Sequence, residues 1–257
     1  MLEARNIRFG YGKTAVLDSV SAAFPPGAMT VIAGPNGSGK TTLLRLLLGL
    51  RTPWSGRCAL DDRATDALRA PDRAARLAYV PHTPEVAFGF TVAEVIGFGG
   101  GPTAENARRD AMDRFDVGDL RARRVDQLSA GQRQRVSLAR AAAQVLSRGR
   151  HRQGRASYLI ADEPIGPLDP RAALRTLAAL RTLTRDAGIG VVAVMHDLSL
   201  ARRFADGALA LDSSGRVAAQ GRAGDVLTPD VLGPVFGASF AEREIGGERV
   251  LAPIAPR

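Results

Sequence analysis

A glycine-rich segment near the N-terminus has the residue types and the spacing that bind phosphate. Residues 34–41 read Gly-Pro-Asn-Gly-Ser-Gly-Lys-Thr and fit the pattern G-x-x-x-x-G-K-[ST]. Glycines let backbone N–H groups turn toward phosphate oxygens. Lys40 would then neutralise the outer phosphates of a nucleotide, and the Thr41 hydroxyl would hold Mg²⁺. The expected nucleotide contacts are Gly34, Pro35, Asn36, Gly37, Ser38, Gly39, Lys40, Thr41 and Thr42.

Two adjacent carboxylates follow an apolar run later in the chain. Residues 158–161, Tyr-Leu-Ile-Ala, predict a buried strand, and Asp162 and Glu163 come directly after it. Ligands of α/β sheets bind at the carboxyl edge of the strands. We expect Asp162 to hold Mg²⁺ through its water shell and Glu163 to orient or deprotonate an attacking water. An apolar strand that ends in Asp-Glu is common, so this interpretation depends on the phosphate loop.

A histidine ends a further apolar run. Residues 191–195 predict another buried strand, and His196 follows it. A lone histidine at a strand end is more often structural than functional. Because this strand belongs to the same predicted sheet as the carboxylates, we expect His196 to contact the terminal phosphate.

The spacing of apolar residues around these groups predicts an α/β fold. Alternating apolar and polar residues at 2–9 and 15–24 predict two antiparallel strands. The phosphate loop lies between an apolar strand at 29–33 and leucines with helical spacing at 41–50. Helical patterns such as 171–185 alternate with further strands, which predicts a mostly parallel sheet covered on both faces. Those strands are expected at 77–80, 158–161, 191–195, 208–211 and 217–220.

The composition is that of a folded protein with a positive charge. The chain has 257 residues, of which 45% are hydrophobic, and a formal net charge of +9. It lacks a window of roughly 18–20 apolar residues and the apolar core of a signal peptide. A single cysteine, Cys58, fits a reducing compartment, so we expect a cytoplasmic protein. Lysine occurs only at positions 13 and 40 and the arginines are scattered, so we expect no nucleic-acid partner.

The segment 128–135, Leu-Ser-Ala-Gly-Gln-Arg-Gln-Arg, resembles the signature motif of ABC ATPases, usually LSGGQ followed by QR. The order of the other motifs is similar to that family over almost the whole chain. Tyr11 stands where an adenine-stacking aromatic is expected. The phosphate loop, the signature, the Asp-Glu pair, Leu168-Asp169 and His196 follow in the family's order.

The resemblance implies a P-loop NTPase (RecA-like) core with a mostly parallel sheet. Residues 1–84 and 156–257 would form this core, including an N-terminal antiparallel β subdomain. Residues 85–155 would be an inserted helical subdomain that carries the signature, in agreement with the mostly helical pattern from 91 to 150. The whole chain would be one ATPase domain that binds ATP and Mg²⁺.

In this family the signature contacts the terminal phosphate held by the opposite subunit. The resemblance carries that role to Ser129, Gly131 and Gln132, at the start of a helix expected near Gln132. It implies a head-to-tail homodimer with ATP buried between the protomers. Glu163 and His196 are the implied catalytic residues.

Three positions depart from the family pattern. His82 replaces a glutamine that touches Mg²⁺ and the attacking water and relays to the membrane subunits. An imidazole could serve either role, and we assign His82 to the metal set, although protonation would oppose Mg²⁺ binding. Ala130 replaces the first signature glycine, a mild change if its φ is negative. Gly166 replaces a serine in the loop between subunits, which removes a hydroxyl; the hydrolytic residues are intact, so we expect an active ATPase.

Two segments indicate the kind of transporter. Residues 88–95 and 224–229 resemble the importers of iron chelates and cobalamin. The polar segment 147–157 resembles an insertion found in haemin importer ATPases. We expect the ATPase of an importer of haemin or another iron chelate, with a siderophore or cobalamin importer as the alternative. The implied partners are permease subunits and, indirectly, a solute-binding protein, at the cytoplasmic face of the plasma membrane.

Other classes of signature-motif ATPase fit less well. DNA-repair and chromosome-organising members place long coiled coils between the phosphate loop and the signature, whereas residues 42–128 contain no heptads. Members that act in translation usually have two cassettes. A regulatory module without hydrolysis stays open because of His82 and Gly166.

Overall fold

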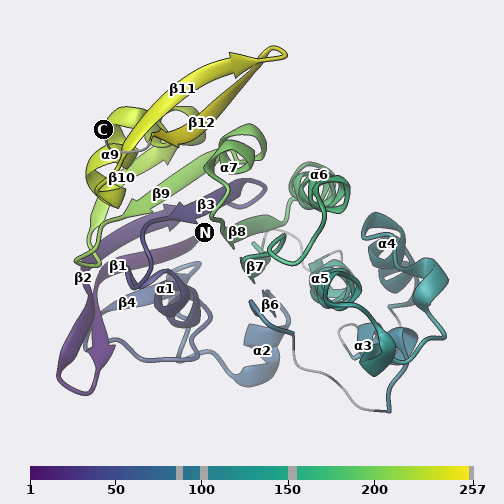
Figure 1. Ribbon diagram of the computed structural model, residues 1–257. Helices are drawn as coiled ribbons and strands as arrows, with labels where there is room; N and C mark the ends of the chain where they lie inside the picture. The colour runs from purple at the N-terminus through teal and green to yellow at the C-terminus, as the bar shows by residue number, and fades with distance from the viewer. Residues whose placement is uncertain (85–88, 99–103, 150–154, 255–257) are drawn as a thin grey trace.

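A six-stranded, mostly parallel β-sheet forms the centre of the protein (Figure 1). The computed structural model describes residues 1–84, 89–98, 104–149 and 155–254. The strand order is β10-β9-β3-β8-β7-β6, and β10 pairs antiparallel with β9 at one edge. The α/β fold predicted from the sequence is therefore confirmed. The strands are β3 (Met29–Ala33), β6 (Leu77–Val80), β7 (Tyr158–Asp162), β8 (Gly190–Val194), β9 (Gly207–Leu211) and β10 (Val217–Arg222).

Two smaller antiparallel sheets accompany it. The N-terminal sheet has the order β2-β1-β4-β5, and the antiparallel pairing of its first two strands is as predicted. A C-terminal hairpin, which the sequence reasoning missed, forms the other sheet. Their strands are β1 (Leu2–Tyr11), β2 (Thr14–Phe24), β4 (Ser55–Leu60), β5 (Arg63–Ala64), β11 (Ser239–Ile245) and β12 (Glu248–Ile254).

The helices lie between the sheets and on the far face of the parallel sheet (Figure 1). Two 3₁₀ turns, at Gly118–Leu120 and Val125–Gln127, precede the signature. The helices are α1 (Lys40–Leu47), α2 (Ala70–Ala74), α3 (Val92–Gly97), α4 (Glu105–Arg114), α5 (Ala130–Gly149), α6 (Pro170–Ala187), α7 (Leu198–Phe204), α8 (Ala223–Val226) and α9 (Pro229–Phe236).

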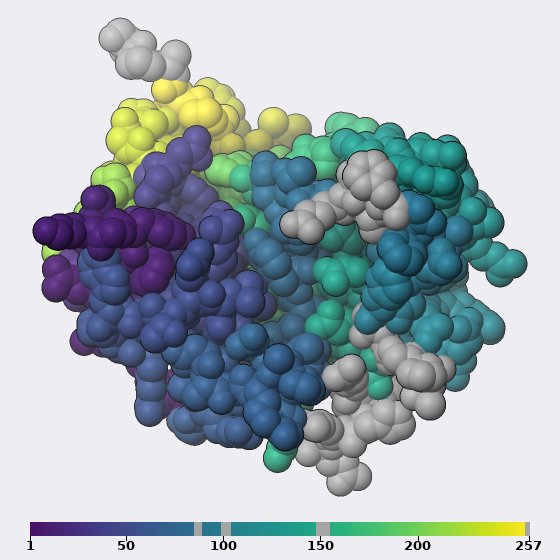
Figure 2. All heavy atoms as spheres, turned by 90° about the horizontal axis from the view of Figure 1, so that it is seen from below, coloured from purple at the N-terminus to yellow at the C-terminus, as the bar shows by residue number. Residues whose placement is uncertain are grey.

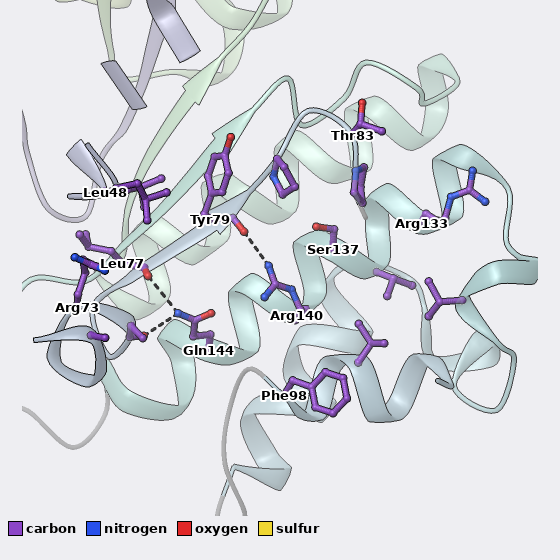
Figure 3. A pocket seen from close by; sticks show the side chains of 18 residues that line it. Leu48, Arg73, Leu77, Tyr79, Thr83, Phe98, Arg133, Ser137, Arg140 and Gln144 are labelled. Atoms are coloured by element: carbon purple, nitrogen blue, oxygen red, sulfur yellow. Dashed lines mark hydrogen bonds between the residues drawn. The ribbon is translucent and has the colours of Figure 1, made fainter. Parts of the chain in front are cut away.

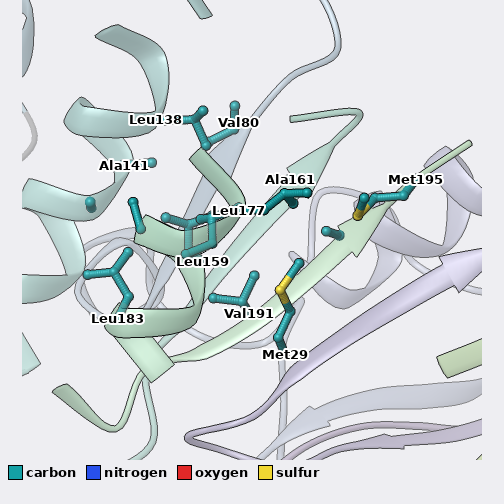
Figure 4. Close-up of a cluster of buried hydrophobic side chains, with 14 of the residues drawn as sticks. Met29, Val80, Leu138, Ala141, Leu159, Ala161, Leu177, Leu183, Val191 and Met195 are labelled. Atoms are coloured by element: carbon teal, nitrogen blue, oxygen red, sulfur yellow. The ribbon is translucent and has the colours of Figure 1, made fainter. Parts of the chain in front are cut away.

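Successive side chains of the central strands point to opposite faces of the sheet, so the hydrophobic core consists of two clusters, one on each face. In β7, Tyr158 and Ile160 pack with α1 and the N-terminal sheet, whereas Leu159 and Ala161 pack with α5 and α6. Figure 4 shows the second cluster, where Leu138 of α5 and Leu177 of α6 cover the sheet. This burial on both faces explains why the central strands read as unbroken apolar runs.

A buried tyrosine connects the two larger sheets. The Tyr158 hydroxyl donates to Phe24 O at 2.8 Å and accepts from Leu2 N at 3.0 Å. Burial raises the pKa of Tyr158 to about 12. Both hydrogen-bonding functions of the hydroxyl are thus satisfied inside the core, where an unpaired hydroxyl would be costly.

Helices α3, α4 and α5 pack together beside β6, on the opposite side from the N-terminal sheet in Figure 2. A capping box at Thr91 and Glu94 begins α3. The assignment of 85–155 as a separate subdomain remains a prediction, because residues 85–88, 99–103 and 150–154 lie outside the described residues. Those gaps include parts of the importer-like segments 88–95 and 147–157. In the described part of the chain, none of the helices combines the length and the apolar character of a membrane span.

Candidate functional site

The phosphate loop connects β3 to α1, and its glycines adopt conformations that other residues rarely reach. Gly34, Gly37 and Gly39 have φ values of +155°, +82° and +89°. A Cβ atom on Gly34 would lie 2.4 Å from Leu211 O. Around Gly37 the space is open within 4 Å of the equivalent position. The loop is thus packed tightly at its base and open at its tip, where a ligand can approach the backbone.

Lys40, the first residue of α1, points back into this loop. Its side chain is buried, and Nζ donates to Gly34 O and Pro35 O at 2.8 Å each. Burial lowers the pKa of Lys40, while the charges of Glu163 and Asp162 oppose that shift. The two hydrogen bonds hold the ammonium group inside the curve of the loop, beside the helix N-terminus that favours an anion.

Thr41 and Asp162 meet, although they are 121 positions apart in the sequence. Thr41 Oγ1 donates to Asp162 Oδ2 at 2.7 Å, and Asp162 is only 3% exposed. Hydroxyl and carboxylate oxygens are the ligands that Mg²⁺ prefers. The described residues hold no group of three or more His, Cys, Asp or Glu side chains that could bind a metal. Thr41 and Asp162 together offer two oxygen atoms of the kind that bind Mg²⁺.

Glu163 lies between two histidines from two other loops. His196 Nε2 is hydrogen-bonded to Glu163 Oε1 at 2.7 Å, and His82 Nδ1 lies 3.3 Å from Glu163 Oε2. The sequence predicted a phosphate contact for His196 and a metal contact for His82. The structure brings both residues to the Glu163 carboxylate.

The backbone of Glu163 is strained. Its φ is +53°, in the left-handed region, where a residue with a side chain costs about 1–3 kcal/mol. Glu163 N donates to Val194 O at 3.2 Å, and Gly166 N donates to Glu163 O at 3.3 Å. Such a conformation persists when neighbours determine it, and it is frequent at functional sites.

Gln134 is a contact of this residue that the sequence reasoning missed. It is fully buried on α5, and its Nε2 donates to Glu163 O at 3.4 Å. Its position within the Gln-Arg pair that follows the signature was the available signal.

Tyr11 lies beside the phosphate loop and lines the same cavity as Glu163. A cavity of 490 Å³ is lined by Tyr11, the phosphate loop, Glu163 and His196. Tyr11 is half-exposed, and its hydroxyl lies 3.4 Å from Thr42 Oγ1. This hydrogen bond lowers the pKa of Tyr11. The cavity therefore unites most of the residues that the sequence singled out.

The signature residues do not line this cavity. Gln132 N donates to Ser129 Oγ at 3.2 Å, and Ser129 N donates to Gln132 Oε1 at 3.0 Å, which forms a capping box. Helix α5 begins at Ala130, two residues before Gln132, near which the start was expected. The cap explains the difference, because Ser129 supplies the N-cap. Ala130 has a negative φ, so alanine can replace the first signature glycine at this position without backbone strain.

The loop after Glu163 packs against the start of α5. A Cβ atom on Gly131 would meet Pro167 O at 3.2 Å and Leu168 Cδ2 at 3.3 Å. Asp169 accepts from Ala172 N at 2.9 Å and caps α6. The start of the signature helix and this loop are therefore in direct contact.

A second and larger cavity lies away from the phosphate loop. This β6–α5 groove has a volume of 730 Å³ and is lined by residues of α2, β6, α3 and α5 (Figure 3). Arg140 Nη2 donates to Tyr79 O at 2.9 Å, and burial lowers the pKa of Arg140. Leu50 and Phe98 border the groove with 52% and 63% of their surface exposed.

The same groove reaches the loop that carries His82. Pro81 and Thr83, on either side of this histidine, both line it. A ligand or protein segment bound in the groove would therefore contact the residues on either side of His82, which itself lies beside Glu163.

The fold, the phosphate loop and the carboxylate and histidine side chains beside it together define a P-loop nucleoside triphosphatase. The family model described as ABC transporter matches residues 17–166, more than half of the chain. The chain belongs to the ABC transporter family, and it is an ATPase of that family.

Similar proteins and a similar solved structure agree with this family assignment. The hemin import ATP-binding protein HmuV of Bordetella pertussis is 41% identical over 243 residues, 92% of each chain. The protein of the same name from Rhizobium meliloti is 37% identical over 243 residues, 92% of this chain and 91% of that one. A dimeric bacterial ABC transporter cassette superposes with a TM-score of 0.73 at 25% identity, over 87% of this chain and 99% of that one.

Proposed function

We propose that this chain is the ATP-hydrolysing subunit that powers a haemin importer. The similarity to hemin import ATP-binding proteins, up to 41% identity over 92% of both chains, carries this proposal. The pairing of Thr41 with Asp162 beside the phosphate loop supplies its chemical basis.

Each side chain has a proposed role in ATP hydrolysis. The phosphate loop and Lys40 bind the phosphates, and Thr41 and Asp162 hold Mg²⁺. Glu163 orients or deprotonates the attacking water, and His196 holds Glu163 and reaches toward the terminal phosphate. Tyr11 stacks on the adenine.

Two copies of the chain would form a head-to-tail dimer. The signature residues Ser129, Gly131 and Gln132 do not line the cavity of their own phosphate loop, which supports a role on the partner's nucleotide. The similarity to a dimeric transporter cassette adds support.

The permease would dock in the β6–α5 groove. The groove is lined mostly by apolar side chains and is bordered by exposed Leu50 and Phe98, the kind of surface that accepts an amphipathic helix. We propose that this contact holds the chain at the cytoplasmic face of the membrane, and that a solute-binding protein acts through the permease. A Phe98→Asp variant should hydrolyse ATP alone but should fail to co-purify with the permease.

The substrate is tested by reconstitution. The chain, its permease and its solute-binding protein would be placed in vesicles, and ATP turnover measured with haemin, a ferric siderophore and cobalamin. Stimulation by the haemin-loaded binding protein is expected. Stimulation by the siderophore or cobalamin alone would exclude haemin as the substrate.

A further inference from the structure

The Glu163 carboxylate has one histidine at each of its two oxygens. His196, after β8, binds Oε1 through Nε2 at 2.7 Å. His82, after β6, places Nδ1 3.3 Å from Oε2. Because β6 and β8 flank β7 in the sheet, the two rings reach the carboxylate from both neighbouring strands.

The backbone alone does not fix this carboxylate. Hydrogen bonds from Glu163 N and to Glu163 O hold the left-handed residue at the end of β7. They leave the side-chain torsions free, and a glutamate has three of them. Fixing these torsions requires contacts at the carboxylate itself, because a long side chain otherwise samples several rotamers.

Among the residues that the structure describes, the contact at Glu163 Oε2 comes from His82. A Cβ atom on Gly166 would lie 3.6 Å from Glu163 Oε2, so the glycine leaves this oxygen without a neighbouring side chain from that position. Asp162 is engaged with Thr41 toward the phosphate loop. The imidazole of His82 is the neighbour that meets Oε2 at 3.3 Å.

We propose that His82 is a positioning residue for Glu163 rather than a ligand of Mg²⁺. Together with His196 it fixes the carboxylate in one orientation beside the phosphate loop. Small displacements of a reacting group can lower the rate about 100-fold, so this restraint acts on turnover and not on nucleotide binding. The inference rests on the proposed function of Glu163 in ATP hydrolysis.

Steady-state ATPase kinetics of the full chain would test this role. In His82→Ala, kcat should fall about tenfold or more, while KM for ATP and the Mg²⁺ activation constant stay within about twofold. His82→Asn should recover most of kcat, because its amide nitrogen replaces ring Nδ1. In a Glu163→Gln background, His82→Ala should cause no further loss. His82 is 58% exposed, and thermal unfolding of each variant verifies that it folds.

Two results would overturn the proposal. A raised Mg²⁺ activation constant with normal kcat at saturating Mg²⁺ would make His82 a metal ligand. An unchanged kcat in His82→Ala would remove its role altogether. Failure of the proposed function would look different, because the unmodified chain would then turn over ATP at a rate that Glu163→Gln does not lower.

Discussion

The phosphate loop and the surroundings of Glu163 solve the same problem of positioning in different ways. Within residues 34–41 the geometry comes from backbone conformation, with three glycines at positive φ and Lys40 bonded to two loop carbonyls. Around Glu163 it comes from side chains of separate elements, with His82 and His196 on two loops and Gln134 on α5. A backbone site depends on a contiguous sequence, whereas a side-chain site depends on the tertiary fold. We expect mutations in the first to abolish binding and mutations in the second to change the rate.

The largest effect is expected at Gly34. In Gly34→Ala the new Cβ would lie 2.4 Å from Leu211 O, in a conformation that alanine rarely adopts. We expect ATP affinity to fall about 100-fold or more, because the loop must shift. Titration with a fluorescent ATP analogue measures this. Gly118→Ala is the matched control, since its Cβ would meet open space and affinity should persist; equal affinities for both variants would contradict the backbone account.

A smaller effect is expected at the signature. Gly131→Val would press on Pro167 and Leu168, where even a Cβ atom is 3.2–3.3 Å from its neighbours. Turnover should fall about tenfold, because the surface proposed to meet the partner's nucleotide is displaced. ATP binding to the isolated chain should not change. Loss of both properties together would show that the signature and the phosphate loop are not separate binding surfaces.

Tyr11 tests a side-chain contact with the base. Loss of one stacked ring is worth about 1 kcal/mol at the low end, so Tyr11→Ala should raise KM for ATP about fivefold. Tyr11→Phe keeps the ring and should preserve KM. An equal change in both variants would assign the effect to the hydroxyl and its contact with Thr42.

The smallest effect is expected at Gly166. Its φ is not positive, and a Cβ atom would have ordinary contacts, at 3.6 Å or more, with Glu163. Gly166→Ser should therefore fold normally and keep turnover within about twofold. A thermal unfolding scan with an ATPase assay measures both. A tenfold loss would mean that the loop after Glu163 tolerates no side chain at this position.

Local patterns predicted the phosphate loop and the central strands, since their evidence lies within a few neighbouring residues. The prediction failed where local patterns are weak. Strand β4 was missed because its first residues, Ser55 to Arg57, are exposed and polar and include Gly56 at a φ of +77°. The β11–β12 hairpin did carry a signal, the turn at Gly246-Gly247 with φ values of +60° and +79°.

The arrangement around Glu163 could not be predicted in the same way. The sequence identified these residues one by one, Glu163 and His196 from the ends of two apolar runs and His82 from a departure from the family pattern. It could not show that both histidines meet the same carboxylate, because that contact depends on the pairing of β6 and β8 with β7. The left-handed backbone of Glu163 and the buried amide of Gln134 are likewise products of packing.

Single-turnover hydrolysis by Glu163→Gln tests the central claim most directly. The substitution preserves the size of the side chain and leaves the phosphate loop unchanged. We predict that the variant binds ATP and Mg²⁺ as the unmodified chain does, while hydrolysis slows about 100-fold or more. Hydrolysis at an unchanged rate would contradict the assignment of Glu163 as the residue that acts on the attacking water.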